Sequence, residues 1–184
     1  MGLNEKLFLS INNFAGQNEV LDKVGVFLGE NGPFIFIGLI VYLYFVRKNK
    51  RAAIYATITV ILAIVFNRIL EIFYFHPRPF VEGLGTVLKE HAPDSSFPSD
   101  HTTFMLALSW GLMMFGETKK IGIKMLILGT IFGLLRVFEG VHWPFDIVGA
   151  LVMGWITAII VMKMEKIFNP LVEMILGIDR KIFK

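Results

Sequence analysis

The sequence predicts an all-α protein, a polytopic transmembrane helical bundle, from three observations. Hydrophobic residues make up 55% of the 184 residues and charged residues only 18%, whereas soluble domains contain about 25% charged residues. The apolar residues form long blocks instead of the short alternating runs of strands. Basic residues gather in short loops beside these blocks, which is typical of membrane topology and not of nucleic-acid binding. We therefore expect a single domain over residues 1–184, surrounded by membrane lipids, with no nucleic acid as partner.

The first two predicted spans are long and strongly apolar. The first is centred on residues 33–46, PFIFIGLIVYLYFV, extends back into residues 24–28, and ends at the basic stretch RKNKR. The second, residues 52–75, is long enough to cross the ~30 Å hydrocarbon core at about 1.5 Å per residue. A polar segment with prolines and glycines, residues 76–98, interrupts the apolar pattern. We expect this segment to form a loop between two spans.

Three further apolar runs complete five clear spans: residues 99–115, 121–138 and 145–162. The fourth span carries Gly129 and Gly133 four residues apart, and the fifth repeats this spacing with Ala150 and Gly154. Small residues at this spacing let membrane helices approach closely. We expect these faces to lie at helix–helix contacts.

The two ends of the chain leave alternatives open. Residues 3–27 mix apolar and charged positions, which predicts either a sixth span or interfacial helices. Residues 1–16 lack the basic start, long apolar core and cleavage site of a secretory signal peptide. The tail, residues 165–184, repeats apolar pairs between charged residues. It predicts either a helix lying in the membrane interface or an extension of the fifth span.

The orientation of the bundle is predicted from its basic loops. Cations follow the first, third and fifth spans: Arg47, Lys48, Lys50, Arg51, Lys119, Lys120, Lys124, Lys163 and Lys166. These loops share one side of the membrane, which the positive-inside rule makes the cytoplasmic side. Residues 76–98 and 139–144 are then expected to face outward.

Three short segments at the outward ends of the spans collect the residues that can carry chemistry: HPRPF (76–80), PSDH (98–101) and RVFEGVHWPFD (136–146). Together they supply two arginines, a serine, and an aspartate four residues after a histidine. A guanidinium group can donate two parallel hydrogen bonds to phosphate oxygens, and a helix N-terminus attracts anions. Two imidazoles can act as nucleophile and general acid. This set of residues favours hydrolysis of a phosphate ester or anhydride.

The same segments resemble the signature of the type-2 phosphatidic acid phosphatase (PAP2) superfamily, which shares its site with vanadium haloperoxidases. That signature reads K-x6-R-P, P-S-G-H and S-R-x5-H-x3-D, and the resemblance covers roughly residues 50–165. The matching positions are Arg78, Pro79, Pro98, Ser99, His101, Arg136, His142 and Asp146. The segments YFHPRPF and FPSDHTT are similar to those of bacterial undecaprenyl-diphosphate phosphatases of the bacitracin-resistance type.

The resemblance implies a role for each matching residue. His142 attacks phosphorus and Asp146 accepts a hydrogen bond from its other ring nitrogen. His101 protonates the leaving group and then activates water. The implied phosphate-binding residues are Arg78, Ser99, Arg136 and Asp100. The resemblance implies no metal and no other cofactor.

The chain departs from the family pattern at three positions. Glu71 stands where the family has lysine, Asp100 replaces the glycine, and Leu135 replaces the serine. The lost lysine removes a cation from the phosphate site. Two compensations are open: Arg68, one helical turn earlier, restores the cation, or Glu71 holds Arg78 in position. Because both histidines are intact, we expect a retuned site and not an inactive one.

The predicted function is hydrolysis of undecaprenyl diphosphate to undecaprenyl phosphate and phosphate through a phosphohistidine. The reaction is expected at the outer leaflet of a bacterial cell membrane, where it recycles the cell-wall lipid carrier and opposes bacitracin. The enzyme alternative is a phosphatidic acid or phosphatidylglycerophosphate phosphatase. The alternative of another class is a permease or a lipid-diphosphate-binding pseudoenzyme, although span centres nearly free of charge weigh against transport.

Partners and cofactors are expected to be few. The polyprenyl diphosphate substrate and membrane lipids are the expected partners, with no obligate protein partner and no cofactor. Acidic residues near the three segments leave a metal ion open as an alternative, because hard cations favour carboxylate oxygens. These residues are Glu71, Asp100, Glu139 and Asp146.

Overall fold

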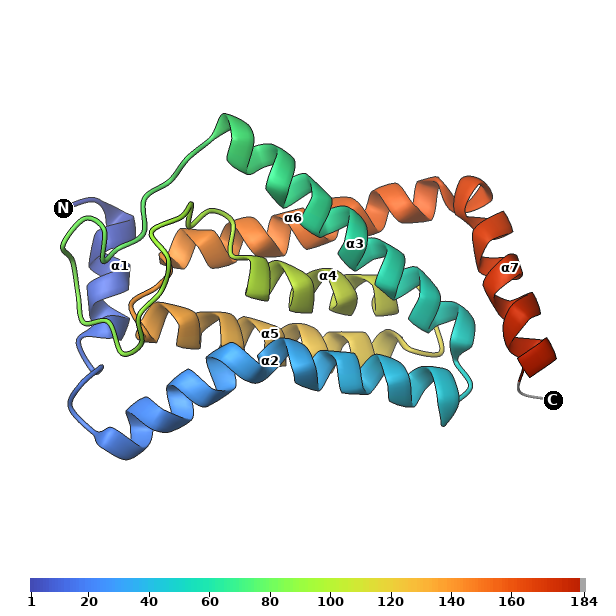
Figure 1. The fold of residues 1–184 in the computed structure, drawn as a ribbon, viewed down its shortest axis with the longest axis horizontal. Helices are drawn as coiled ribbons and strands as arrows, with labels where there is room; N and C mark the ends of the chain where they lie inside the picture. Colours follow the sequence, from blue (N-terminus) through green and yellow to red (C-terminus); the bar gives the residue numbers. More distant parts are fainter. Residues whose placement is uncertain (183–184) are drawn as a thin grey trace.

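The computed structural model describes residues 1–182, and every regular element among them is an α-helix (Figure 1). The helices are α1 (Leu3–Asn12), α2 (Glu19–Phe45), α3 (Lys50–Phe73), α4 (Asp100–Met113), α5 (Lys119–Phe138), α6 (Pro144–Lys163) and α7 (Glu165–Ile182). The helices α2, α3, α5 and α6 are long and apolar enough to cross a membrane. The prediction of an all-α membrane bundle is confirmed.

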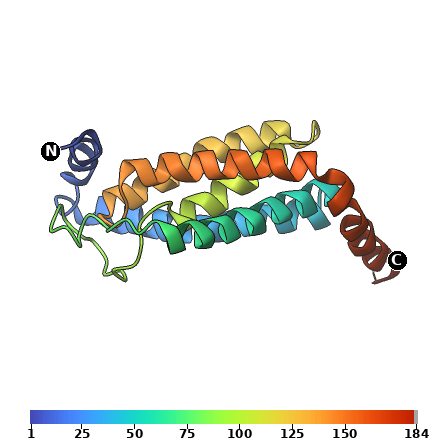
Figure 2. The ribbon, with the colours of Figure 1, turned by 90° about the horizontal axis from the view of Figure 1, so that it is seen from above.

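The third predicted span, α4, is the shortest of the five and lies at the centre of the bundle. Its 14 residues give about 21 Å at about 1.5 Å per residue. It packs against α2, α3, α5 and α6 (Figures 1 and 2). It begins deeper in the bundle than α6 does, beneath the loop of residues 74–99. We call the end of the bundle that carries α1 and this loop the loop end, and the end that carries α7 the tail end.

Small residues let α4 pack closely on its neighbours. A Cβ added at Gly133 of α5 would lie 2.8 Å from the methyl group of Thr102. A Cβ added at Gly154 of α6 would lie 2.8 Å from the backbone nitrogen of Ala107. Both distances are too short for any residue but glycine. The predicted contact faces of the fourth and fifth spans are therefore confirmed, and both face α4.

Of the predicted N-terminal segment, residues 3–12 form the short helix α1 and residues 19–27 form the first turns of α2, so the segment is not a sixth span. The 10 residues of α1 measure about 15 Å, half of the ~30 Å hydrocarbon core. Its Phe8 packs on Trp143, with ring centroids 5.2 Å apart. The Asn12 side chain donates to the carbonyls of Thr86 and Phe138, at 2.8 Å each. These contacts tie loop 74–99 to the end of α5.

The tail forms a separate helix, α7, that leaves the bundle at an angle after Met164 (Figures 1 and 2). Ion pairs hold it to α3: Arg51 Nη1 lies 2.5 Å from Glu173 Oε1, and Lys50 pairs with Asp179. Its exposed apolar side chains recur at helical spacing: Ile167, Leu171, Met174, Ile178 and Ile182. This apolar stripe favours an interfacial helix over an extension of the fifth span.

Candidate active site

A polar pocket of about 210 Å³ opens at the loop end of the bundle. It is lined by α3, by loop 74–99, by the start of α4 and by the turn between α5 and α6. Six of the predicted site residues line it: Arg68, Glu71, Arg78, Asp100, His101 and His142. Segments far apart in the sequence therefore converge on one pocket, and the two predicted catalytic histidines open onto the same space.

His142 and Asp146 form a pair at the start of α6. Pro144 begins the helix, as its fixed φ favours, so His142 lies just before the first turn and Asp146 within it. His142 Nδ1 lies 3.2 Å from Asp146 Oδ2. The same carboxylate oxygen accepts the backbone N–H of Trp143 at 2.8 Å, which fixes its position. With Nδ1–H donated to Asp146, the lone pair on Nε2 remains for a nucleophilic role.

The environment of His142 keeps its ring neutral. The side chain is only 3% exposed, and burial lowers its pKa well below the ordinary histidine range. The nearby guanidinium groups of Arg78 and Arg136 lower this pKa further, because a second positive charge would be repelled. A neutral ring keeps the Nε2 lone pair that attack on phosphorus requires.

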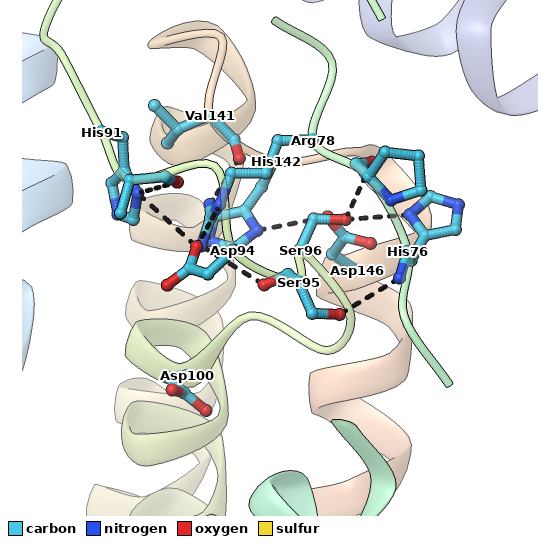
Figure 3. Close-up of polar contacts among 12 residues, drawn as sticks. His76, Arg78, His91, Asp94, Ser95, Ser96, Asp100, Val141, His142 and Asp146 are labelled. Carbon is cyan, nitrogen blue, oxygen red and sulfur yellow. Dashed lines mark hydrogen bonds and ion pairs between the residues drawn. The ribbon is translucent and has the colours of Figure 1, made fainter. Parts of the chain in front are cut away.

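Arg78 lies against the nucleophile. Its Nη1 lies 3.3 Å from His142 Nε2 and donates to the carbonyl oxygen of Val141 at 2.7 Å (Figure 3). Its Nε donates to Asp94 Oδ1 at 2.8 Å, and its Nη2 to the carbonyl oxygen of Ser95 at 3.4 Å. The guanidinium is thus held by loop 74–99 on one side and by the α5–α6 turn on the other. A phosphate in front of Nε2 would meet this cation directly.

A second arginine reaches the pocket from α3. Arg68 Nη1 lies 2.8 Å from Glu71 Oε2, and its Nη2 lies 2.5 Å from Asp100 Oδ2. Asp100 also accepts the side-chain N–H of Asn67 at 2.9 Å. Of the two compensations considered for Glu71, the structure contains the contact with Arg68, while Arg78 pairs with Asp94. For Asp100, this geometry favours positioning of Arg68 over direct contact with an anionic phosphate.

Two predicted phosphate-binding residues do not line the pocket. Ser99 caps α4: its Oγ accepts the hydroxyl of Thr102 at 3.0 Å, and its backbone N–H donates to the carbonyl of Asp146 at 3.5 Å. Arg136 is 1% exposed, and its Nη1 lies 2.6 Å from Glu139 Oε2. Their contacts with phosphate stay predictions. In the structure Ser99 joins the start of α4 to α6, and Arg136 pairs with Glu139.

Several residues of the site were not identified from the sequence, and two of them hold the segment of Arg78 in place. Asp94, the ion-pair partner of Arg78, belongs to loop 74–99, where no residue spacing relates it to the motifs. Trp143 is 2% exposed, and its Nε1–H donates to the carbonyl of Pro77 at 2.8 Å. This bond fastens the segment that carries Arg78 to the start of α6. The adjacency of Trp143 to His142 is the one sequence signal that could have identified it.

The acidic residues considered for a metal ion are engaged separately. Within residues 1–182, no group of three or more histidine, cysteine, aspartate or glutamate side chains is arranged to hold a metal. Glu71 and Asp100 pair with Arg68. Glu139 pairs with Arg136, and Asp146 with His142. The metal alternative therefore finds no set of converging ligands in the described part of the chain.

Fold and site together define a class of protein, an integral-membrane phosphatase in which a buried histidine–aspartate pair faces an arginine. The family model of the PAP2 superfamily matches residues 52–169, more than half of the chain, and the chain belongs to this superfamily. The resemblance noted from the three motifs is thereby confirmed.

Particular relatives narrow the class. The undecaprenyl-diphosphatase BcrC of Bacillus subtilis (strain 168) is 34% identical over 182 residues, covering 98% of this chain and 93% of that protein. The bacitracin transport permease protein BcrC of Bacillus licheniformis is 36% identical over 163 residues, covering 86% and 79%. The crystal structure of Aquifex aeolicus LpxE matches with a TM-score of 0.71 and 27% identity, covering 89% of this chain and 96% of that one.

Proposed function

We propose that this protein hydrolyses undecaprenyl diphosphate to undecaprenyl phosphate and inorganic phosphate. The observation that carries the proposal is the buried His142, whose Nε2 lies 3.3 Å from Arg78 Nη1 in a pocket that also contains His101. A relative that matches 98% of this chain is named an undecaprenyl-diphosphatase, which supports this substrate. A diphosphate also presents two phosphate groups joined by a single oxygen, and two arginines line the pocket.

The proposed reaction has two steps. Nε2 of His142 attacks the terminal phosphorus, a nitrogen–phosphorus bond forms, and the bond from that phosphorus to the bridging oxygen breaks. His101 gives its proton to the leaving undecaprenyl phosphate, and Asp146 stabilises the imidazolium. His101 then takes a proton from water, whose oxygen attacks the same phosphorus, and phosphate leaves as His142 is regenerated.

The arginines stabilise charge in both transition states. Arg78 exchanges its contact with Nε2 for one with an equatorial oxygen of the reacting phosphate. Arg68 supplies the cation from α3 to the second phosphate group, and Glu71 and Asp100 position it. Ser99 acts through the start of α4, and Arg136 acts through the positive charge that it adds near His101 and His142.

The loop end is proposed to face the outside of a bacterial plasma membrane. The basic residues at the tail end support this orientation through the positive-inside rule. The chain contains no cysteine, so Val87→Cys at the loop end and Gly116→Cys at the tail end can each be labelled alone. We expect an impermeant maleimide to label residue 87 on whole cells, and residue 116 only after lysis. The opposite pattern would reverse the orientation.

The second candidate function is export, because a relative is named a bacitracin transport permease protein. The deciding experiment offers purified protein undecaprenyl diphosphate, phosphatidylglycerophosphate and phosphatidic acid, with His142→Ala alongside. We expect the isoprenoid diphosphate to have the highest kcat/KM and the variant to release no phosphate. Faster turnover of phosphatidylglycerophosphate would overturn the substrate. Phosphate release by the variant would overturn the role of His142, and a wild-type protein that releases no phosphate from any of the three lipids would favour the export function.

A further inference from the structure

An apolar groove lies beside the polar pocket, on the outer surface between α3 and α6. Its volume is about 470 Å³, and Leu70 of α3 lines one side of it. Val148, Val152 and Ile156 of α6 line the other side and are 53%, 44% and 41% exposed. On the outside of a membrane bundle, exposed apolar side chains of this kind meet lipid chains and not water.

Phe97 and Pro98 join the groove to the polar pocket, because both residues line both spaces. The ring of Phe97 lies on α6 at Gly149, where an added Cβ would come within 2.4 Å of one ring carbon. Tyr74 packs edge-on against the same ring, with centroids 5.7 Å apart. The Phe97 ring and Pro98 therefore form the boundary between the headgroup pocket and the groove on the outer surface of the bundle.

We propose that this groove binds the part of the polyprenyl chain that adjoins the diphosphate, an inference that rests on the proposed function. A lipid diphosphate changes from highly charged to fully apolar within a few bonds. Its binding site must make the same change over the same distance. In the structure the lining changes from charged to apolar at Phe97, with the arginines of the pocket on one side and the aliphatic side chains of α6 on the other.

The dimensions of the groove limit how much of the chain it holds. Its α6 lining runs from Phe145 to Ile156, which corresponds to about 16 Å of helix axis, roughly half of the ~30 Å hydrocarbon core. The groove therefore holds the first isoprene units, and the remainder of the chain stays among the membrane lipids. Chain length beyond these units should contribute little to recognition.

A second apolar groove provides the matched comparison. It lies at the same loop end, between α1, α5 and α6, and Leu134 lines it. Its volume is about 270 Å³, and none of its described lining residues belongs to the polar pocket. A chain in this groove would have no direct route to His142. Leu134 is 39% exposed, close to the 44% of Val152, so tryptophan at either position faces a similar environment.

The experiment compares Val152→Trp with Leu134→Trp and wild type. We expect Val152→Trp to raise KM for farnesyl and undecaprenyl diphosphate by about tenfold, the effect of losing about one buried aliphatic contact. The inhibition constant of inorganic phosphate, which has no chain, should stay unchanged. Leu134→Trp should change neither. Equal KM values in all three proteins, or the same increase in both variants, would overturn the chain site.

A second measurement does not depend on turnover or on a bulky substitution. In the cysteine-free chain, Val152→Cys combined with His142→Ala can be modified by a hydrophobic maleimide with and without farnesyl diphosphate. Protection at residue 152, and none in the corresponding Leu134→Cys protein, is expected, and equal rates with and without ligand would overturn the site. A wild-type protein that leaves both prenyl diphosphates intact would overturn the proposed function and the chain site together. Normal wild-type turnover with an unaffected Val152→Trp would overturn the chain site alone.

Discussion

Nη1 of Arg78 lies 3.3 Å from Nε2 of His142. A guanidinium only donates hydrogen bonds, so the ring nitrogen that faces it is an acceptor and carries no proton. The proton of the neutral ring is then on Nδ1, next to Asp146. A single contact thus specifies the tautomer of the nucleophile and places a cation where the phosphate oxygens will arrive.

Replacing Asp146 with asparagine tests the other side of this ring. The imidazolium that forms when Nε2 bonds to phosphorus loses its buried carboxylate, so we expect kcat to fall by about 10²–10⁴-fold with a smaller change in KM. Steady-state hydrolysis of farnesyl diphosphate measures both constants, and equal thermal stability of the two proteins excludes misfolding. An unchanged kcat would contradict the role of Asp146.

The helices of the C-terminal half could be predicted closely from the sequence. The runs 121–138 and 145–162 correspond to α5 (Lys119–Phe138) and α6 (Pro144–Lys163), because long apolar blocks end at charged residues or at proline. The start of α2 was missed because its first turn is charged. Asn18 caps that turn, its Oδ1 accepting the backbone N–H groups of Val20 and Leu21 at 3.0 Å. Acidic residues after such a cap stabilise the helix start.

The sequence predicted which residues lie at the site better than it predicted which of them pair with one another. The four-residue spacing, with Pro144 at the start of a helix, placed Asp146 one turn beyond His142. The pairing of Arg78 with Asp94 depends on the path of an irregular loop, which no periodicity describes. The same limit applies to Arg136: its position in the motif predicted a phosphate ligand, which stays a prediction, but its contact with Glu139 was not predicted.

Removing the charge of Asp94 should strengthen anion binding. Its carboxylate lies 2.8 Å from Arg78 Nε and competes with phosphate for that guanidinium. In Asp94→Asn, we expect the inhibition constant of inorganic phosphate to fall by about tenfold or more, since a hydrogen bond to a charged group contributes about 1.5–3 kcal/mol. Glu90→Gln, an exposed carboxylate in the same loop, is the matched control. A rise in the inhibition constant would mean that Asp94 orients Arg78 and does not compete for it.

Glu139 should make the stability of the protein depend on pH. Burial raises the pKa of this side chain to about 8, although Arg136 lies 2.6 Å away and acts in the opposite direction. The folded state therefore holds the proton more tightly than the unfolded chain does. Stability is greatest below the ordinary glutamate pKa and decreases as the pH rises through about 8, by on the order of a few kcal/mol.

The variant Glu139→Gln retains a hydrogen-bond acceptor for Arg136 and removes this titration. We expect the melting temperature of wild type to fall from about pH 5 to about pH 8, and that of the variant to fall less. Glu90→Gln should behave as wild type does. Parallel pH profiles for wild type and Glu139→Gln would show that Glu139 does not titrate in this range.

Arg68, which contacts Glu71 and Asp100, is proposed to supply the cation that the PAP2 signature places at position 71 as lysine. Arg68→Ala removes a pocket cation, so we expect KM for farnesyl diphosphate to rise by about 10–100-fold, the loss of a charged hydrogen bond. Monophosphate substrates should be affected less, because Arg68 is proposed to bind the second phosphate. Arg51→Ala, at the tail end of the same helix, is the control for loss of an α3 arginine.

The double variant Arg68→Ala/Glu71→Lys moves the cation one turn along α3, to the position where the PAP2 signature has lysine. If the pocket needs a cation from α3 and not arginine itself, the double variant should regain much of the affinity that Arg68→Ala loses. Glu71→Lys alone places two cations beside Asp100 and should bind inorganic phosphate more tightly than wild type. A double variant no better than Arg68→Ala would mean that the fork of the Arg68 guanidinium, held between Glu71 and Asp100, is itself required.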